Sequence, residues 1–337
     1  MSKQKLLIER DVESVMRDGT ILRANVYRPD TDERLPVLLQ RTPYNKDASS
    51  VDFCLLSASR RYAVVVQDTR GRWASDGTHY PMRDEFQDGY DWVEWAAAQP
   101  WANARCLWPT PTPNCWTQWA AASTQPPSLA AIIPSMTFTD LYADLIHPGG
   151  ALSLGVMVSW NLASGVGNAI PRMGLPDKEK AELQERLADA LDGMATGDTF
   201  PTLPLSGMPL LKQKIFGEAF LDMVAHESKD SYWQATDVRS RIDRISVPAY
   251  HLGGWYDLFT NGTLASYSAM VEHAGTPTAR SGQKLIMGPW LHGPLEGLVG
   301  EVDFGVRASD MFVLSYETMW RWFDYWLKGI DNGIMDY

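Results

Sequence analysis

The fold is decided by VPAYHLGGWYD at residues 247–257, together with KLIMGPWLH at residues 284–292. Each stretch contains a short apolar run without alternation, which is typical of a strand covered on both faces. Each run then passes through glycine and reaches one ionisable residue about five positions beyond the strand, Asp257 in the first and His292 in the second. Because parallel strands end at the same edge of a sheet, we expect these two side chains to lie together.

Strand and helix alternate on both sides of this pair. A polar–apolar alternation over residues 6–27 is broken at Asp18-Gly19, which favours a tight hairpin turn. Short apolar runs predict buried strands at residues 36–40, 62–68, 129–134, 247–252 and 284–288. Helical spacing predicts helices at residues 51–59, 85–98, 262–272 and 310–327. The predicted class is therefore α/β, a mostly parallel sheet flanked by helices.

The strand rhythm stops between about residues 139 and 241, where segments such as 176–194 are polar and helix-forming. We interpret this region as a helical cap inserted over the carboxyl ends of the strands, where it would shape a pocket. The predicted organisation is a first part of the α/β domain at residues 1–138, a cap at 139–243 and a second part of the α/β domain at 244–337.

Composition limits the partners and the compartment. A net charge of −11 and a pI near 5.0 leave no polycationic surface, so we expect neither nucleic acid nor membrane partners. No secretory signal or membrane span is evident, which predicts a cytoplasmic protein. Cys54, Cys106 and Cys115 are an odd number without metal-ligand spacing, so no disulfide framework, metal site or cofactor is expected. Cys54 is expected to be a buried thiol.

The Asp257–His292 pair indicates acyl-transfer chemistry. A carboxylate beside a histidine fixes the imidazole tautomer and stabilises the imidazolium that forms during general-base catalysis. A single Asp or His in a loop is more often a cap or a surface residue, so the prediction depends on the two together. The chain order, with the acid before the base, is that of the α/β-hydrolases.

Several short motifs along the chain resemble those of the CocE/NonD hydrolases, which include the cocaine esterases and are related to the Xaa-Pro dipeptidyl-peptidases and α-amino-acid ester hydrolases. The motifs are Arg17-Asp18-Gly19, Arg41-Thr42-Pro43-Tyr44, Gln67-Asp68-Thr69-Arg70-Gly71, Ser75-Asp76-Gly77, Asp88-Gly89-Tyr90-Asp91, Gln99-Pro100-Trp101, Thr117-Gln118-Trp119, Gly254-Trp255-Tyr256-Asp257 and Gly288-Pro289-Trp290-Leu291-His292. The resemblance implies an α/β-hydrolase fold and a small ester, amide or short peptide as substrate.

By this resemblance, Asp257 is the acid of a catalytic triad, His292 is the general base, and Tyr44 donates its hydroxyl to the oxyanion. A phenol can stabilise a developing oxyanion as a backbone amide would. Tyr44, which follows a Thr-Pro turn, is alternatively an anchor for its loop. Arg70, Arg72 and Asp76 are expected to form a structural ion-pair loop rather than to contact substrate.

The nucleophile segment departs from the family. The family carries Gly-x-Ser-Tyr-x-Gly about five residues before the Thr-Gln-Trp that is present here at residues 117–119. Counting without gaps, Thr112 replaces the serine, Pro113 the tyrosine after it, and Thr110 and Cys115 the two glycines. Side chains at the glycine positions crowd a strained turn, and a proline has no N–H to donate to the oxyanion. The usual nucleophile elbow is therefore lost.

Three explanations of this segment stay open. Thr112 is the residue in the nucleophile position, whereas Cys115 is chemically better suited but lies three residues late in register. The chain is alternatively a catalytically silent binding protein. Only residues 105–116 depart while both flanks keep their length, a pattern that two compensating frameshifts would produce. Pro109, Pro111 and Pro113 also predict a local disturbance of the central strand.

The resemblance also bears on the end of the chain. Members of the family continue beyond the Trp-Leu-Lys-Gly helix into a β jelly-roll domain, whereas this sequence stops at Tyr337. We expect a fragment or a chain without that domain. Its aromatic last helix would then expose a surface that the domain normally covers, and this surface could support self-association. The apolar cap residues, Trp255 and Trp290 suggest hydrophobic or aromatic acyl groups, but they do not fix a substrate.

Overall fold

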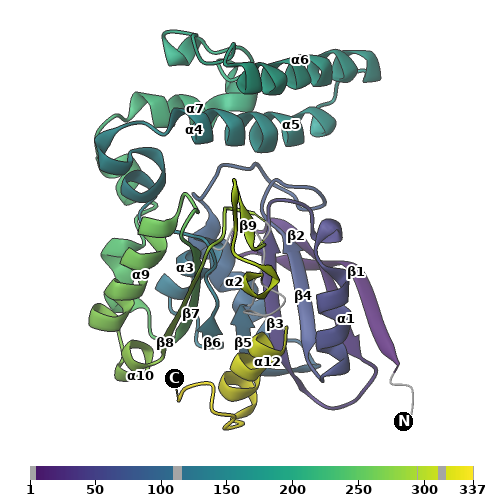
Figure 1. Cartoon of the computed structure of the whole chain (residues 1–337). Helices are drawn as coiled ribbons and strands as arrows, with labels where there is room; N and C mark the ends of the chain where they lie inside the picture. Colours follow the sequence, from purple (N-terminus) through teal and green to yellow (C-terminus); the bar gives the residue numbers. More distant parts are fainter. Residues whose placement is uncertain (1–4, 109–115, 294, 310–315, 337) are drawn as a thin grey trace. The chain divides into compact units, whose positions relative to one another are not determined.

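A computed structural model describes residues 5–108, 116–293, 295–309 and 316–336. The chain forms two compact units, one made of Met1–Asp140 with Asp237–Tyr337 and one made of Leu141–Thr236 (Figure 1). The first unit contains the sheet, and the second is helical. Among the described residues, no helix is long and apolar enough to cross a membrane.

The first unit is built on an eight-stranded sheet with the order β1-β2-β4-β3-β5-β6-β7-β8. Its strands are β1 (Leu6–Val15), β2 (Ile21–Pro29), β3 (Leu35–Thr42), β4 (Ala63–Asp68), β5 (Ala102–Trp108), β6 (Leu129–Ile132), β7 (Ala249–Gly254) and β8 (Gln283–Gly288). The β1–β2 and β2–β4 pairs are antiparallel, and the other five pairs are parallel. The predicted α/β class with a mostly parallel sheet is confirmed.

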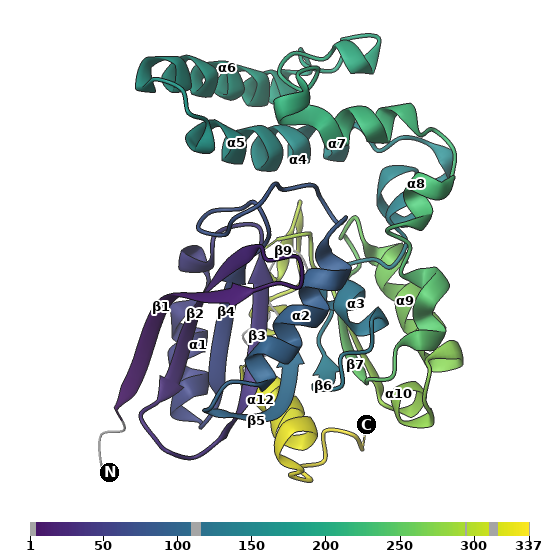
Figure 2. The same cartoon turned by 180° about the vertical axis from the view of Figure 1, so that it is seen from behind.

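Helices cover both faces of this sheet, with α1 and α12 on one face (Figure 1) and α2 and α3 on the other (Figure 2). Neighbouring residues of β7 show the two layers, because successive side chains of a strand point to opposite faces. Tyr250 contacts Trp322, whereas His251 contacts Trp119 and Tyr267. The helices are α1 (Val51–Ser59), α2 (Glu85–Ala97), α3 (Trp116–Ser123), α9 (Thr260–His273), α10 (Pro277–Ser281) and α12 (Tyr316–Phe323), which continues as a π-helical turn, η8 (Asp324–Lys328).

Local sequence explains most of these elements. The β1–β2 hairpin turns at Gly19, whose φ of +85° favours glycine. Ser50 accepts a hydrogen bond from the amide of Phe53 and so caps α1. Strands β3 and β4 are buried at every position, as their continuous apolar runs predict.

Strand β5 is the irregular member of the sheet. Its ladders shift register between Leu35 and Val37 on one side and between Cys106 and Leu107 on the other, and Ala104 has a φ of +61°. These irregularities precede the three prolines in sequence. Pro109, Pro111 and Pro113 lie outside the described residues, so their predicted effect on the strand stays a prediction.

The second unit contains only helices and connecting segments among its residues. They are η2 (Tyr142–Ile146), η3 (Pro148–Gly150), α4 (Leu154–Trp160), η4 (Asn161–Val166), α5 (Gly167–Arg172), α6 (Asp177–Thr196), η5 (Leu205–Gly207), α7 (Lys214–Ala225) and α8 (Ser231–Gln234). Helix α6 ends at Gly197, whose φ of +87° provides a left-handed cap. Thr139, Asp140 and the segment from Asp237, with η6 (Arg239–Arg244), belong to the first unit.

The described part of the last helix is packed rather than exposed. Met319, Trp320, Trp322 and Phe323 are buried in the core, and Trp320 donates its indole N–H to Ser57 Oγ at 3.0 Å. Tyr316, Tyr325 and Trp326, on this helix and its continuation, are half-buried, so the expectation that part of this surface is exposed stays a prediction. Exposed apolar side chains also occur between Leu291 and Val306, on a segment with a short hairpin of β9 (Leu298–Val299) and β10 (Val302–Asp303) followed by η7 (Val306–Ala308).

Candidate active site

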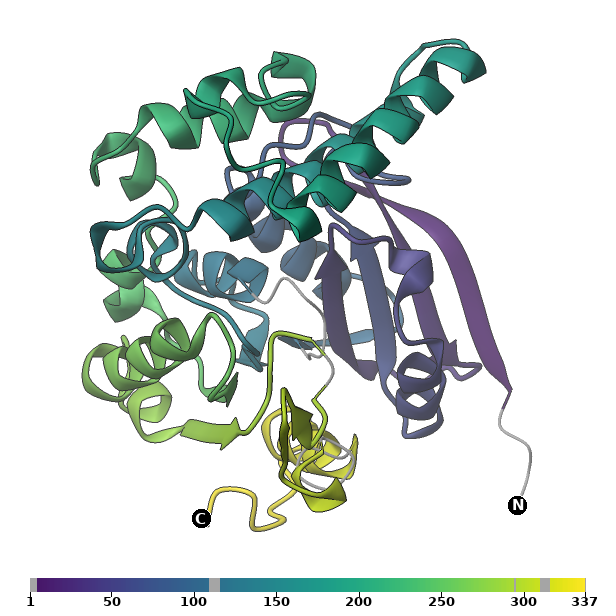
Figure 3. The same cartoon turned by 45° about the horizontal axis from the view of Figure 1, so that its top comes forward.

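Asp257 lies in a tight turn between β7 and α9, at the edge where the parallel strands end. Figure 3 shows the chain with its upper edge turned toward the viewer. Its amide donates to the carbonyl of Gly254 at 3.2 Å. The hydroxyl of Thr260, the first residue of α9, lies 2.5 Å from that same carbonyl and 2.6 Å from the carbonyl of Asp257. The turn is thus fixed by its own backbone and by one threonine, and the Asp257 side chain is fully buried.

His292 reaches Asp257 because the two strand exits are hydrogen-bonded to each other. The amide of Trp255 donates to Gly288 at 2.8 Å, and the amide of Tyr256 donates to the carbonyl of Trp290 at 3.1 Å. His292 Nδ1 then lies 3.0 Å from Asp257 Oδ1, within the hydrogen-bond distance expected from the sequence. The His292 side chain is 35% exposed, and Phe259 meets its ring edge to face.

This geometry fixes the protonation pattern of a neutral imidazole. An ionised carboxylate can only accept, so Nδ1 carries the proton and Nε2 keeps a lone pair that can take a proton from another group. Asp257 Oδ2 is buried and has no hydrogen-bond partner among the described residues. Among the described residues, the His292 imidazole is thus the only side chain that hydrogen-bonds the Asp257 carboxylate. The pair can act as a base, His292, and an acid that orients it, Asp257.

Tyr44 follows β3 at the same edge of the sheet and is half-buried. Its loop is held by the carbonyl of Pro43, which accepts from Arg72 Nε at 3.0 Å and from Trp73 Nε1 at 2.9 Å. The buried Asp68 fixes the next residues, because its Oδ1 accepts from the amide of Lys46 at 2.7 Å. These contacts show a braced loop, and the role of the Tyr44 hydroxyl stays a prediction.

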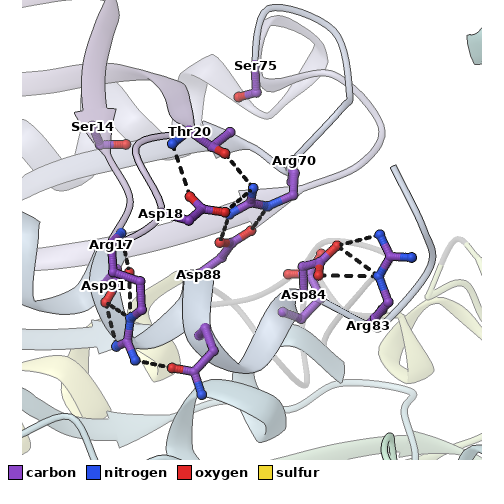
Figure 4. Close-up of polar contacts among 12 residues, drawn as sticks. Ser14, Arg17, Asp18, Thr20, Arg70, Ser75, Arg83, Asp84, Asp88 and Asp91 are labelled. Carbon is purple, nitrogen blue, oxygen red and sulfur yellow. Dashed lines mark hydrogen bonds and ion pairs between the residues drawn. The ribbon is translucent and has the colours of Figure 1, made fainter. Parts of the chain in front are cut away.

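The neighbouring loop after β4 is held by ion pairs (Figure 4). Arg70 contacts Asp88 at 2.5 Å and Asp18 at 2.8 Å, and the hydrogen bond from Arg70 lowers the pKa of Asp18 to about 2. Asp76 pairs with Arg23 at 2.7 Å. The structural role predicted for Arg70, Arg72 and Asp76 agrees with these partners.

The nucleophile segment is described only at its flanks. Thr110, Thr112, Pro113 and Cys115 lie outside the described residues. On the far side, α3 is tied to the end of β6, because the Gln118 side chain donates to the carbonyl of Ile133 at 3.0 Å and accepts from its amide at 2.9 Å. A strand, β5, therefore precedes the segment and a firmly anchored helix follows it.

Two of the cysteines are buried free thiols. Burial raises the pKa of Cys54 to about 12, and it also raises the pKa of Cys106 well above its usual value. Neither is a nucleophile, since the thiolate is the reactive form. The expectation that Cys54 is a buried thiol is confirmed.

Trp290 packs in the core rather than at a surface open to substrate. The side chain is fully buried, and its indole N–H donates to the carbonyl of Ala308 at 2.6 Å. Trp255 is 58% exposed and remains available. Sequence reasoning also missed Phe259 and Thr260, which lie two and three residues after Asp257. Their short distance from Asp257 in the sequence was the signal for a structured turn.

Among the residues that the structure describes, no group of three or more His, Cys, Asp or Glu side chains is arranged to hold a metal ion.

Comparison with known proteins decides the family. A model of the X-Pro dipeptidyl-peptidase (S15) family matches residues 18–294, a range that includes Asp257 and His292. The chain belongs to the S15 (CocE/NonD) hydrolase family. The chain is 33% identical to the cocaine esterase of Rhodococcus sp. (strain MB1 Bresler) over 301 residues, which cover 87% of the chain and 50% of that relative.

Solved structures of similar proteins show the same fold. A CocE/NonD family hydrolase from Staphylococcus aureus matches with a TM-score of 0.67 at 21% identity, over 99% of this chain and 53% of that one. An aminopeptidase from a marine sediment archaeon, Thaumarchaeota archaeon, matches with a TM-score of 0.69 at 20% identity, over 96% and 55%. The chain therefore has an α/β-hydrolase fold, and it spans about half the length of these relatives.

Proposed function

We propose that the chain is an acyl hydrolase of the serine-hydrolase type, acting on a carboxylic ester, an amide or a short Xaa-Pro peptide. The observation that carries this proposal is the 3.0 Å contact between His292 Nδ1 and the buried Asp257. Membership of the S15 family supports the reaction class, because its relatives include a cocaine esterase.

In the proposed reaction, His292 Nε2 takes the proton of an attacking hydroxyl as that oxygen bonds to the acyl carbon. Asp257 stabilises the imidazolium, and Tyr44 donates its phenolic hydroxyl to the oxyanion. His292 then returns the proton to the leaving group as the acyl bond breaks. Water completes the cycle by the same steps, so no cofactor is needed.

The segment that should supply the nucleophile departs from the family motif. Thr112 is the residue in the nucleophile position, but Pro113 has no amide proton for the oxyanion. Losing one such donor costs about 100- to 1000-fold in rate. This substitution favours a second candidate function, a catalytically silent α/β-hydrolase that only binds a small ligand.

A fluorophosphonate probe separates the two functions, because it reacts only with an activated nucleophile. The enzyme is expected to be labelled, and His292→Ala is expected to abolish the labelling. Asp257→Asn should slow it by about 10³- to 10⁴-fold, since it disturbs the tautomer. His273→Ala is the matched control, because that side chain is 68% exposed and lies at the last residue of α9, at the opposite end of the helix from Asp257. A folded chain that is not labelled at any pH would establish the silent protein.

The remaining expectations are part of the same proposal. Residues 139–243 are proposed to cap the strand ends, and the working compartment is proposed to be the cytoplasm. Self-association is proposed through exposed apolar side chains, which are numerous between Leu291 and Val306.

A further inference from the structure

Trp290 is central to the junction between the two strand exits. It lies two residues before His292, it is fully buried, and it belongs to the same core cluster as α12. Its backbone carbonyl, its indole ring and its indole N–H each make a specific contact.

The backbone carbonyl of Trp290 links the segment that carries His292 to the segment that carries Asp257. It accepts from the amide of Tyr256, the residue before Asp257, at 3.1 Å. A methyl group at Gly254 would lie 2.1 Å from this carbonyl oxygen. Only a glycine allows the two exits to approach so closely.

The ring of Trp290 fixes the exit of β8. A methyl group at Gly288 would lie 2.3 Å from the indole, so the ring lies directly against the backbone from which His292 departs. The indole N–H then reaches Ala308 at the end of η7 at 2.6 Å. Phe304 in that segment also contacts the ring of Tyr256, with 6.0 Å between centroids.

The indole hydrogen bond is not a general result of burial. Trp116, Trp119 and Trp322 are also buried, and their indole nitrogens have no hydrogen-bond partner among the described residues. Trp290 thus differs from these tryptophans in making a specific bond, and that bond ends on the segment that also contacts Tyr256.

We propose that Trp290 is the positioning residue that sets the Asp257–His292 contact, by tying both strand exits to the chain at Ala308. This inference rests on the proposed function, in which the pair is the acid and base. Trp290 touches no reacting atom in this scheme. It acts by holding the peptide backbone that carries each side chain.

The test compares Trp290→Phe with Trp322→Phe, a matched loss of a buried indole that makes no hydrogen bond among the described residues. Two readouts by NMR are specific: the His292 Nδ1–H resonance and the hydrogen exchange of the Tyr256 amide. Trp290→Phe is expected to broaden or remove the first and to speed the second by about tenfold. Trp322→Phe is expected to leave both within about twofold of the wild-type chain, after correction for any change in global stability.

A second variant guards against misfolding. 3-Benzothienyl-alanine at position 290 has nearly the shape of tryptophan but lacks the N–H, and it is expected to reproduce the effect of Trp290→Phe. Equal effects of the changes at 290 and 322, or an unchanged His292 Nδ1–H signal in both variants at position 290, would overturn the proposal. Because neither readout needs turnover, failed fluorophosphonate labelling would count against the proposed function and not against this inference.

Discussion

Asp257 is held in a way that suits a catalytic acid better than a structural one. Its carboxylate is buried, and one of its two oxygens has no hydrogen-bond partner among the described residues. Leaving a buried acceptor unsatisfied costs about 1–3 kcal/mol, and more for a charged group. His292 bonds the other oxygen, so it is the side chain through which this carboxylate would act in the proposed reaction.

Two other buried residues give the fold an opposed pH dependence. Burial raises the pKa of Glu85 to about 7, although Arg41 at 2.8 Å partly opposes this. Burial lowers the pKa of His251 to about 4. As the pH rises from 4.5 to 7, the raised pKa of Glu85 therefore lowers the free energy of unfolding. As the pH rises from 4 to 6.5, the lowered pKa of His251 increases the free energy of unfolding.

Glu85→Gln is expected to remove the first contribution and leave the second. Relative to the wild-type chain, the free energy of unfolding of the variant should increase by up to about 3 kcal/mol between pH 4.5 and 7. Urea denaturation at several pH values measures this difference. Glu182→Gln, on the exposed face of α6, is the control. Its free energy of unfolding should change with pH as that of the wild-type chain does. Parallel curves for Glu85→Gln would show that Glu85 ionises normally.

At the scale of elements, local pattern predicts the strands and helices around the site well. The helix predicted at residues 51–59 matches α1, and the helix predicted at residues 85–98 ends one residue earlier. For these elements, the local sequence preference and the pattern of residues buried against the parallel sheet predict the same structure. The Asp257–His292 contact was also predictable, since it depends on strand order and loop length.

Tertiary contacts determine which apolar residues are buried, and local sequence alone does not predict this. An apolar residue at a strand exit, such as Trp290, has the same local pattern whether it faces a pocket or the core. Only the glycine at position 288 and the distant carbonyl of Ala308 make it a core residue. The packing of the last helix also depends on tertiary partners, because its aromatic residues contact α1 and β7.

The close approach of the two strand exits is itself testable. Gly254→Ala is expected to lower the free energy of unfolding by about 1–3 kcal/mol, because the new methyl group would lie 2.1 Å from the carbonyl of Trp290. Gly155→Ala in α4 is the control: no atom lies within 4 Å of its methyl group, and it should stabilise the helix by about 0.5–1 kcal/mol. Thermal and urea denaturation distinguish the two. Similar effects would mean that the exits are free to separate.

At the scale of the whole molecule, the α/β-hydrolase fold of the S15 family is present around a segment that departs from the family motif. The S15 family match runs from residue 18 to residue 294 and extends on both sides of that segment. Strand β5 and helix α3 flank it, and Asp257, His292 and the braced Tyr44 loop come from separate parts of the chain. We infer that the change is confined to the segment between Asn103 and Thr117.

The most direct measurement is therefore a repair of that segment, assayed on a p-nitrophenyl ester. Thr112→Ser alone is expected to fail, because Pro113 still lacks the oxyanion amide. Adding Pro113→Tyr, Thr110→Gly and Cys115→Gly, with strand-compatible residues at positions 109 and 111, should raise kcat/KM by about 100-fold or more over Thr112→Ser. His292→Ala in the repaired chain should abolish that gain. A folded repaired chain no more active than Thr112→Ser, or one whose activity survives His292→Ala, would contradict the account.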